Sequence, residues 1–439
     1  MRIVYLMPGA GGTFYCENCL RDAGLIRGLH KLGHEPLMVP LYLPLQLEEP
    51  GPVDSAPVFF GGINVYLQQK AAFFRKTPRW VDRMFDAPAL LRWAAGKAGM
   101  TNPKDLAETT LSMLRGEDGR QAKELERLVA WLAAEEHPEI VCLSNALLLG
   151  VARRVREELR APVVCSLQDE DIFLDALPEP YRQRAWDAVA ERARDADAFI
   201  AVSRYYAGLM QERLGLPPER VHVVYNGISP DGYEPAPSPP HPPVIGFLER
   251  MYPEKGLDIL VDAFLLLRAG ARFPGLKLRV AGGWSAGDKA FLEGLRDRLQ
   301  AEDATEEVEL LANLDRKARQ DFLRSLSVLS VPARHGEAFG MYVLEALASG
   351  VPVVLPRHGA FPELVEATGG GVLYDPNEPR TLAEALGALL DDPQHARRLG
   401  QQGRRAVLES FNVGRTAENS VRVYQETARH APHPGAARC

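Results

Sequence analysis

The chain alternates short β-branched runs with segments of helical periodicity, and it does so in two successive sets. The candidate strands are residues 2–7, 36–39, 140–143, 163–167, 199–202 and 221–225 in the first set, and 244–248, 276–281, 308–311, 328–331, 351–355 and 372–374 in the second. Helical stretches such as Leu20 to Leu32, which ends before Gly33, lie between several of them. This alternation predicts an α/β protein with two Rossmann-like, doubly wound parallel sheets facing a cleft.

The division into two domains follows from length and proline content. A chain of 439 residues exceeds what one hydrophobic core usually serves. Between residues 230 and 243, seven of fourteen residues are proline, a composition that favours extended backbone. We therefore expect a first domain over residues 1–229, a linker at 230–243 and a second domain over 244–410. The stretch from about 61 to 119 lacks strand alternation and is predicted to be a helical insertion.

Charge and cysteine content exclude several classes of protein. The net charge of −7 argues against nucleic acid as a partner. No apolar run approaches the length of a membrane span, and the N-terminus enters a predicted strand instead of a signal-peptide pattern. Five cysteines over this length indicate a reducing compartment. The sequence therefore predicts a soluble, cytoplasmic protein.

The turn after the first predicted strand, Pro8 to Thr13, contains Gly11 and Gly12 and precedes a helix. Bare backbone amides at a helix N-terminus favour an anion, so a phosphate site is one interpretation, and a tight turn without a ligand is the other. Phe14 occupies the third glycine position of the dinucleotide fingerprint, and no acid follows the second strand. Both departures argue against hydride-transfer chemistry.

Two further predicted strand ends carry charged or glycine residues. Arg250 and Lys255 lie on the loop after the strand that opens the second domain, and Gly282 and Gly283 follow the next strand. Two cations on one loop could neutralise a diphosphate, although exposed cations are more often only solvated. Their position at the carboxyl ends of strands is what favours a ligand site.

Glu337 and Glu345 flank the entrance of a helix predicted from Met341 to Ser349 and closed by Gly350. A fully helical run would place their backbones roughly 12 Å apart. Because the paired carboxyl groups of glycoside hydrolysis lie about 5 to 9.5 Å apart, this spacing suits the two ends of one extended ligand better than one scissile bond. The alternative is a helix N-terminal charge for Glu337 and a surface position for Glu345.

Other clusters give weaker signals. Cys16, Cys19, His30 and His34 suggest a zinc site, but Cys19 and His30 lie roughly 16 Å apart along one predicted helix, which is too far for shared ligation. We therefore interpret these cysteines as packing residues and predict no zinc site at this cluster. Aromatic and basic residues mix between residues 73 and 93. This pattern leaves a peripheral membrane contact open, although a buried helix with a basic outer face is the preferred interpretation.

Taken together, these residues resemble the retaining glycosyltransferases of the GT-B fold, in particular glycosyltransferase family 4. The likeness covers nearly the whole chain and is strongest from Val244 to Tyr374. The motifs that carry it are the Arg-x4-Lys-Gly loop, the Glu-x7-Glu run, Gly350 to Val354 and Pro362-Glu363. Residues 59–66, Phe-Phe-Gly-Gly-Ile-Asn-Val-Tyr, are also similar to bacterial glycogen synthases.

The resemblance implies a nucleotide-diphosphate sugar as donor, a carbohydrate or another hydroxyl compound as acceptor, and no cofactor or metal. By the same resemblance Arg250 and Lys255 hold the diphosphate, Glu337 meets hydroxyls of the transferred sugar, and Glu345 binds the ribose. Backbone amides of Phe339, Gly340 and Met341 lie beside the sugar and phosphates, while Gly11 and Gly12 close on the donor. The C-terminal stretch, about residues 411–439, is expected to cross back to the first domain.

Three departures from the family pattern keep alternatives open. Gln168 stands where many members have histidine, and a glutamine cannot act as a base. Glu249 replaces a glycine before the phosphate-binding arginine, and Cys16 and Cys19 are not family features. The remaining alternatives are a sugar phosphorylase, a nucleotide-sugar epimerase or a non-catalytic sugar-nucleotide-binding protein.

Overall fold

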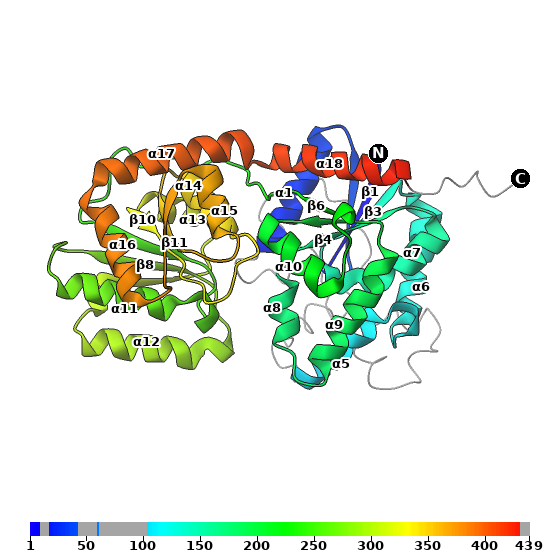
Figure 1. Ribbon diagram of the computed structural model, residues 1–439, viewed down its shortest axis with the longest axis horizontal. Coiled ribbons are helices and arrows are strands. Elements are labelled where there is room, and N and C mark those ends of the chain that lie inside the picture. The colour runs from blue at the N-terminus through cyan, green and yellow to red at the C-terminus, as the bar shows by residue number, and fades with distance from the viewer. Residues whose placement is uncertain (9–16, 43–58, 61–102, 431–439) are drawn as a thin grey trace, which may run out of the picture. The chain divides into compact units, whose positions relative to one another are not determined.

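The computed structural model describes residues 1–8, 17–42, 59–60 and 103–430 (Figure 1). The described chain forms two compact units. The first unit contains residues 1–8, 18–42, 59–60, 103–225 and 416–430, and the second contains Asn226–Arg415. Each unit has its own parallel sheet flanked by helices, so the predicted α/β class with two Rossmann-like sheets is confirmed.

The first unit is built on six parallel strands in the order β2-β1-β3-β4-β5-β6. The strands are β1 (Arg2–Met7), β2 (Glu35–Pro40), β3 (Ile140–Leu143), β4 (Val163–Leu167), β5 (Ala198–Ala201) and β6 (Val221–Val223). The helices are α1 (Glu17–Lys31), α5 (Pro103–Leu114), α6 (Ala122–Trp131), α7 (Ala152–Leu159), α8 (Glu170–Asp175), α9 (Tyr181–Arg192), α10 (Arg204–Leu214) and α18 (Val413–His430). Short turns of 3₁₀ helix cover Gly116–Asp118, Ala146–Val151, Ala193–Asp195 and Pro218–Arg220, and one π-helical turn covers Leu132–Glu136.

The second unit has the strand order β12-β11-β10-β7-β8-β9. Its strands are β7 (Val244–Leu248), β8 (Lys277–Gly282), β9 (Val308–Ala312), β10 (Val328–Leu329), β11 (Val353–Pro356) and β12 (Gly371–Tyr374). Its helices are α11 (Leu257–Ala269), α12 (Lys289–Ala301), α13 (Arg316–Arg324), α14 (Met341–Ala348), α15 (Phe361–Thr368), α16 (Pro379–Asp391) and α17 (Pro393–Ser410). Turns of 3₁₀ helix cover Pro253–Lys255, Ala286–Asp288 and Thr305–Glu307.

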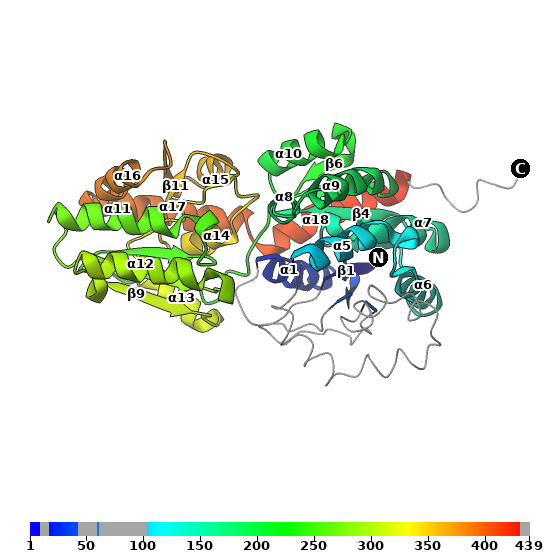
Figure 2. The ribbon, with the colours of Figure 1, turned by 90° about the horizontal axis from the view of Figure 1, so that it is seen from below.

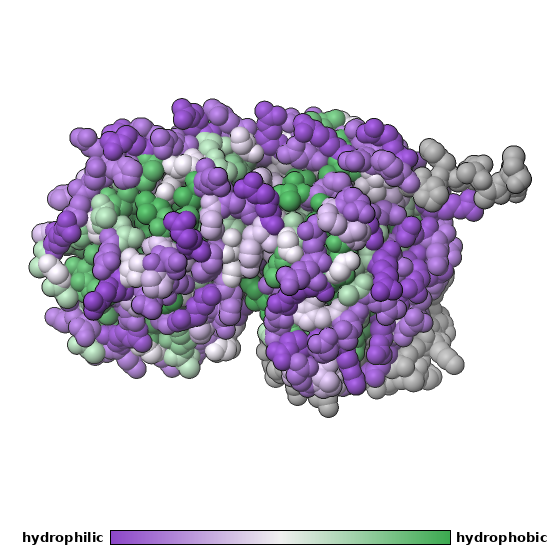
Figure 3. Space-filling model, in the orientation of Figure 1, coloured by the Kyte–Doolittle hydropathy of each residue, from purple (hydrophilic) through white to green (hydrophobic). Residues whose placement is uncertain are grey.

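The helices obey ordinary capping and amphipathicity rules. In α10 the Ser203 hydroxyl accepts a hydrogen bond from the Tyr206 amide, and Gly215 ends the helix with a positive φ of 61°. Helix α11 packs against α16, as Figure 2 shows from a second direction. Helices α14 and α15 pack against α17. Figure 3 shows hydrophilic residues along the outer side of α17, whose Gly400, Gly403 and Val407 are buried.

Helix α18 supplies part of the hydrophobic core of the first unit. Ala417, Val421, Val423 and Tyr424 belong to the same buried cluster as residues of β1, α1, β2 and β3. Tyr424 is 2% exposed. The first unit is therefore assembled from two segments of the chain that are separated by the whole of the second unit.

The proline-rich segment differs from the expectation of a linker. Residues 230–243 belong to the second unit, where Tyr233 is buried and its backbone carbonyl accepts a hydrogen bond from Arg404. Because proline has a fixed φ, a proline-rich segment loses little backbone entropy when it is ordered against the rest of the unit. Pro235 packs closely against Gly350: a Cβ atom added to Gly350 would lie 2.9 Å from the side chain of Pro235.

Two predictions from the sequence fall partly or wholly on residues outside the described ranges. The predicted insertion includes α5, which is helical, but residues 61–102 are not described. Gly11, Gly12 and Cys16 likewise lie outside the described residues. Among the helices that the structure describes, none has the length and hydropathy that a bilayer crossing requires.

Candidate functional site

The candidate site lies where the strand order of the second unit reverses. Strands β7 and β10 are neighbours in the sheet, although β8 and β9 come between them in the sequence and lie on the other side of β7. Loops at the carboxyl ends of two such strands diverge and leave room for a ligand. Lys255 follows β7 and Glu337 follows β10, so both stand on loops at this reversal point.

The loop after β7 is held against the loop after β10. Gly256 has a positive φ of 70°, and a Cβ atom there would lie 1.9 Å from the carbonyl oxygen of Pro332. The Arg334 amide donates a hydrogen bond of 2.8 Å to the carbonyl of Glu254. Only glycine, which has no Cβ atom, can approach the Pro332 carbonyl so closely at position 256. The Lys-Gly pair of the motif therefore places Lys255 beside the residues that follow β10.

Lys255 and Glu337 form a buried ion pair, with 2.5 Å between Nζ and Oε1. The Oε1 atom of Glu249 lies 3.8 Å from the same Nζ. The side chains of Lys255, Glu249 and Glu337 are 10%, 9% and 3% exposed. The structure thus brings together two residues predicted from the sequence and adds Glu249, which reasoning from the sequence noted only as a departure.

The charges of this cluster do not balance, because one ammonium faces two carboxylates. The Oε2 atoms of Glu249 and Glu337 are buried and accept no hydrogen bond from the residues that the structure describes. Burial raises the pKa of Glu249 above its ordinary value; Lys255 opposes this shift and Glu337 adds to it. An unsatisfied buried carboxylate oxygen is costly, and a ligand hydroxyl could satisfy it.

The turn that carries Glu337 is fixed by a second close approach. A Cβ atom at Gly359, whose φ is 61°, would lie 2.6 Å from the Glu337 nitrogen. The Ala360 amide also donates to the Glu337 carbonyl at 3.0 Å. The predicted helix is confirmed as α14, which begins after Gly340 and ends before Gly350. Residues 337–340 are not helical, so the roughly 12 Å separation, which assumed a continuous helix, does not apply.

Gly340 directs the chain into α14 with a φ of 91°, and Phe339 and Met341 on either side are buried. A residue with a Cβ atom would be strained in this conformation. The first amides of an α-helix have no partner within the helix and favour negative charge. The predicted role of the Phe339, Gly340 and Met341 amides beside a sugar phosphate stays a prediction, and the start of α14 is compatible with it.

Glu345 has partners of its own inside the second unit. Its Oε1 accepts a hydrogen bond from Arg319 Nε at 3.1 Å and another from the hydroxyl of Tyr233. Glu345 and Arg319 are almost fully buried. The recorded contacts therefore join Glu345 to α13 and to the proline-rich segment, and they do not join it to Lys255 or Glu337. Its assignment to a ribose stays a prediction.

Arg250 turns toward the loop after β8. Its Nη2 atom lies 3.1 Å from Asp288 Oδ2 and 3.3 Å from Ser285 Oγ, and its guanidinium stacks on Tyr252 at 4.8 Å from the ring centroid. The side chain is 41% exposed. In this arrangement Arg250 is near the site but is held by Asp288 and not by the Lys255 cluster.

Gly282 and Gly283 join the ends of β7 and β8. A Cβ atom at Gly282 would lie 1.8 Å from the carbonyl oxygen of Glu249, and the amide of Met251 donates to the Gly283 carbonyl at 2.8 Å. These two glycines therefore let the loops that carry Glu249 and Asp288 approach closely. Their predicted contact with a donor stays a prediction.

Some residues that shape the site were not singled out from the sequence. They are Tyr233, Asp288, Arg319 and Gly359. Two of them left a signal: Ser285 and Asp288 have capping-box spacing, and Arg319 stands on the same helical face as Phe322 and Leu323. Tyr233 and Gly359 act through contacts distant in the sequence, for which no local pattern exists.

In the first unit Gln168 follows β4 and is buried. Its Nε2 atom donates to the Ser144 carbonyl at 2.6 Å, and its backbone amide donates to Glu170 at 2.7 Å. Its Oε1 atom accepts no hydrogen bond from any described residue. An amide at this position can orient a hydroxyl but cannot take up a proton.

Two segments of the chain match models of protein families. Residues 234–406 match the family described as Glycosyl transferases group 1, and residues 110–231 match the family described as Glycosyltransferase Family 4. A D-inositol 3-phosphate glycosyltransferase of Kineococcus radiotolerans is 31% identical over 254 residues, which are 53% of this chain and 58% of the relative. The chain spans little more than half the length of the first relatives it matches.

Solved structures share the fold over almost the whole chain. The sucrose-phosphate synthase of Thermosynechococcus elongatus aligns with a TM-score of 0.70 at 17% identity and covers 97% of this chain and 99% of its own. Anabaena HepE, solved in complex with UDP, aligns with a TM-score of 0.68 at 18% identity and covers 97% and 100%. At such identities the likeness shows the fold alone. Together, the two family matches and the shared fold support a glycosyltransferase of the GT-B fold.

Proposed function

We propose that this protein transfers a sugar from a nucleotide-diphosphate sugar to a hydroxyl of an acceptor, with retention of configuration and without a metal ion. The observation that carries the proposal is the buried Lys255–Glu337 pair at the reversal point of the second sheet. It offers a cation for a diphosphate and a carboxylate with an unsatisfied oxygen for a sugar hydroxyl.

The chemistry follows from the charge that develops during transfer. The bond between the anomeric carbon and the diphosphate oxygen breaks, and negative charge accumulates on the leaving phosphate. The Lys255 ammonium would stabilise that charge, and Arg250 would join it by exchanging Asp288 for phosphate oxygens. The acceptor hydroxyl attacks from the face that the phosphate leaves, and its proton passes to the departing phosphate.

The remaining predicted residues would hold the donor. Glu337 Oε2 would accept a hydrogen bond from a hydroxyl of the transferred sugar, because this oxygen is buried without a partner among the described residues. Glu345 would meet the ribose only by sharing its carboxylate with Arg319 and Tyr233. Backbone amides at residues 339–341 would face the phosphates.

The comparisons suggest which compounds to test first. The HepE structure contains UDP by its description, so UDP-sugars head the donor panel, followed by GDP- and ADP-sugars. The Kineococcus relative is named for D-inositol 3-phosphate, so phosphorylated cyclitols belong in the acceptor panel with plain sugars. A donor that binds the folded state raises apparent stability, by about 2.7 kcal/mol at a hundredfold excess over Kd.

The decisive experiment uses Glu337→Gln with the best donor and acceptor. This variant keeps the side-chain shape, so we expect it to fold and to lose transfer by at least about a hundredfold, since a charge-assisted contact with the sugar is removed. Turnover is measured by nucleotide release and product analysis, with the anomeric configuration read by NMR. Glu366→Gln, on the exposed side of α15, is the control and should be fully active. Unchanged turnover in Glu337→Gln would rule out the assigned role.

A second candidate, a non-catalytic sugar-nucleotide-binding protein, is favoured by one observation. Gln168 stands where a basic histidine is common in this family, and its amide is committed to Ser144. Donor binding without nucleotide release or product across the whole acceptor panel would establish this candidate. Phosphorolysis with inorganic phosphate, or conversion of the donor without an acceptor, would instead indicate a phosphorylase or an epimerase.

A further inference from the structure

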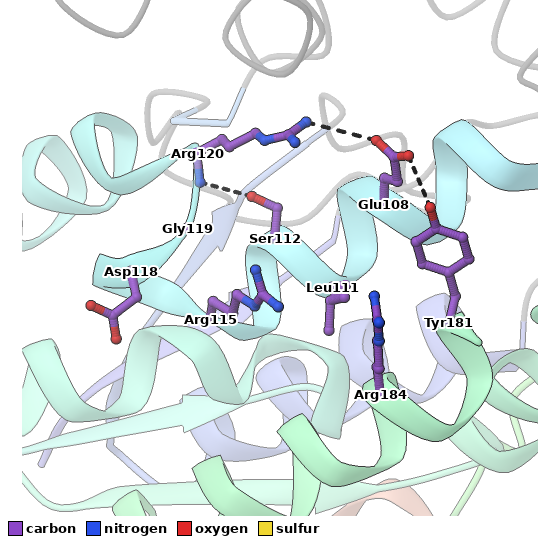
Figure 4. A pocket seen from close by; sticks show the side chains of 9 residues that line it. All are labelled: Glu108, Leu111, Ser112, Arg115, Asp118, Gly119, Arg120, Tyr181 and Arg184. Carbon is purple, nitrogen blue, oxygen red and sulfur yellow. Dashed lines mark hydrogen bonds and ion pairs between the residues drawn. The ribbon is translucent and has the colours of Figure 1, made fainter. Parts of the chain in front are cut away.

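The first unit contains a cavity that belongs to no part of the site described above. Its volume is about 220 Å³, and it lies between α5, the turn after α5 and α9 (Figure 4). Its wall includes Arg115, Arg120 and Arg184, the carboxylates Glu108 and Asp118, and Tyr181. Three arginines and two carboxylates leave this wall with a formal excess of one positive charge.

Two of these arginines, Arg115 and Arg184, have no anionic partner among the described residues. Within the part of the chain that the structure describes, no ion pair or hydrogen bond of the guanidinium groups of Arg115 and Arg184 is recorded. Other arginines of the same unit behave differently: Arg192 contacts Glu117 at 3.2 Å and Asp118 at 3.3 Å, and Arg153 contacts Glu117 at 3.1 Å. An anion bound between the two exposed guanidinium groups of Arg115 and Arg184 would accept a charge-assisted hydrogen bond from each of them.

The turn that carries Arg115 is rigidly built. The carbonyl of Arg115 accepts a hydrogen bond of 2.6 Å from Arg192. A Cβ atom at Gly116 would lie 2.1 Å from the Gly150 carbonyl oxygen, and one at Gly119 would lie 2.0 Å from that of Ser112. The backbone at Arg115 is therefore fixed by packing, which limits the conformational entropy that ligand binding must restrict.

The remaining wall suits hydroxyl groups and a small ring. The Tyr181 hydroxyl donates to Glu108 at 2.9 Å, and Arg120 lies 3.7 Å from the same carboxylate, which leaves acceptor capacity for a ligand hydroxyl. Leu111 supplies an apolar patch. A cavity of about 150 Å³ holds one benzene molecule. The larger volume here therefore has room for a six-membered ring with substituents.

We propose that this cavity binds a small phosphorylated sugar or polyol, with the phosphate between Arg115 and Arg184 and the hydroxyls toward Glu108 and Tyr181. Guanidinium groups match phosphate oxygens in geometry and stay charged at all relevant pH values. The proposal concerns the first unit alone and holds whether or not the second unit transfers a sugar.

The test is calorimetric titration of the full chain with glucose 6-phosphate, inorganic phosphate and glucose. We expect glucose 6-phosphate to bind more tightly than inorganic phosphate, glucose not to bind, and the affinity to fall as salt is added. The double variant Arg115→Gln, Arg184→Gln should bind at least about tenfold more weakly, because two charge-assisted contacts are lost. Both side chains are exposed, and unchanged melting would verify that the variant folds.

Two control variants separate this cavity from other basic sites. Arg194→Gln removes an exposed arginine of the same unit outside the cavity, and Arg250→Gln alters the candidate site of the second unit. Both should bind glucose 6-phosphate like the parent protein. The proposal is overturned if glucose 6-phosphate does not bind, if inorganic phosphate binds as tightly, if the double variant binds normally, or if either control loses affinity equally.

Discussion

Glu249 makes the buried cluster around Lys255 sensitive to pH. The folded state raises the pKa of its carboxyl above the ordinary 4.5, first by burial and then by repulsion from Glu337, with Lys255 acting in the opposite direction. A pKa raised on folding means that the folded protein holds this proton more tightly than the unfolded chain. The contribution of Glu249 to stability is therefore fully present below about pH 4.5 and is lost as the pH rises through the folded pKa.

Replacing Glu249 by glutamine should remove this dependence. We expect the difference in unfolding free energy between Glu249→Gln and the parent to shift in favour of the variant as the pH rises from 4.5 toward neutrality. Urea denaturation at several pH values measures it, because the other titrating groups are common to both proteins. Glu254→Gln, at an exposed position of the same loop, is the matched control for the loss of one carboxylate. A pH-independent difference for Glu249→Gln would contradict the assigned burial effect.

At single positions, the sequence predicted residue types better than partners. Lys255 and Glu337 could be placed together because both follow strands of one predicted sheet, and parallel strands present their carboxyl ends at one edge. The contacts of Arg250 with Asp288 and of Glu345 with Arg319 could not be predicted in this way. Each joins separate elements through the orientation of long side chains, which depends on packing.

At the level of elements, the strand-to-helix turns depend on glycines that allow close backbone approach. Gly359 and Gly369 have the same φ of 61°, but only Gly359 lies against the Glu337 backbone. Gly369→Ala should cost about 1 kcal/mol of unfolding free energy from the left-handed conformation alone. Gly359→Ala adds a steric clash, so we expect a larger loss of stability and a clear loss of donor binding.

The Gly359→Ala and Gly369→Ala variants are compared by urea denaturation and by titration with the donor that gives the largest thermal shift. Gly369→Ala should bind the donor like the parent, since the nearest atom to its added Cβ is a flexible glutamine side chain at 3.6 Å. Equal effects of the two substitutions on both measurements would mean that the contact between Gly359 and Glu337 does not position the site.

The central strands were predictable because both sheets are parallel, and strands such as β3 and β7 are fully buried and therefore short, uninterrupted apolar runs. The predicted run at 140–143 coincides with β3, whereas the run at 328–331 shortens to the two residues of β10. The packing of residues 230–243 could not be read from the sequence for a different reason. Proline content indicates an extended backbone but does not reveal whether that backbone is solvated or packed, and here Tyr233 is buried beside Glu345.

For the molecule as a whole, the two separate cores predict that a core substitution in one unit lowers the stability of that unit and not of the other. Tyr424 of α18 is buried in the core of the first unit, and Phe264 of α11 is fully buried in the second. Truncation of either aromatic side chain to alanine should cost about 3–5 kcal/mol. We expect Tyr424→Ala to reduce hydrogen-exchange protection in β1 and β3 to β5, and Phe264→Ala to reduce it in β7 and β8.

Exchange is followed by mass spectrometry of peptides from both units. Leu408→Ala, at an exposed position of α17, should leave protection unchanged in both. If Tyr424→Ala lowered protection equally in the two sheets, the two units would unfold as one cooperative body. That result would contradict the prediction that α18 stabilises the first unit alone.

The contribution of α18 to the first core also sets an order of events during synthesis. Residues up to Tyr225 leave the ribosome first, yet their core lacks Ala417, Val421 and Tyr424 until the rest of the chain has been made. At about 5–20 residues per second, that delay is roughly ten to forty seconds. The second unit can therefore fold before α18 is available to complete the core of the first unit. In that interval the first unit of the nascent chain exposes apolar surface to chaperones.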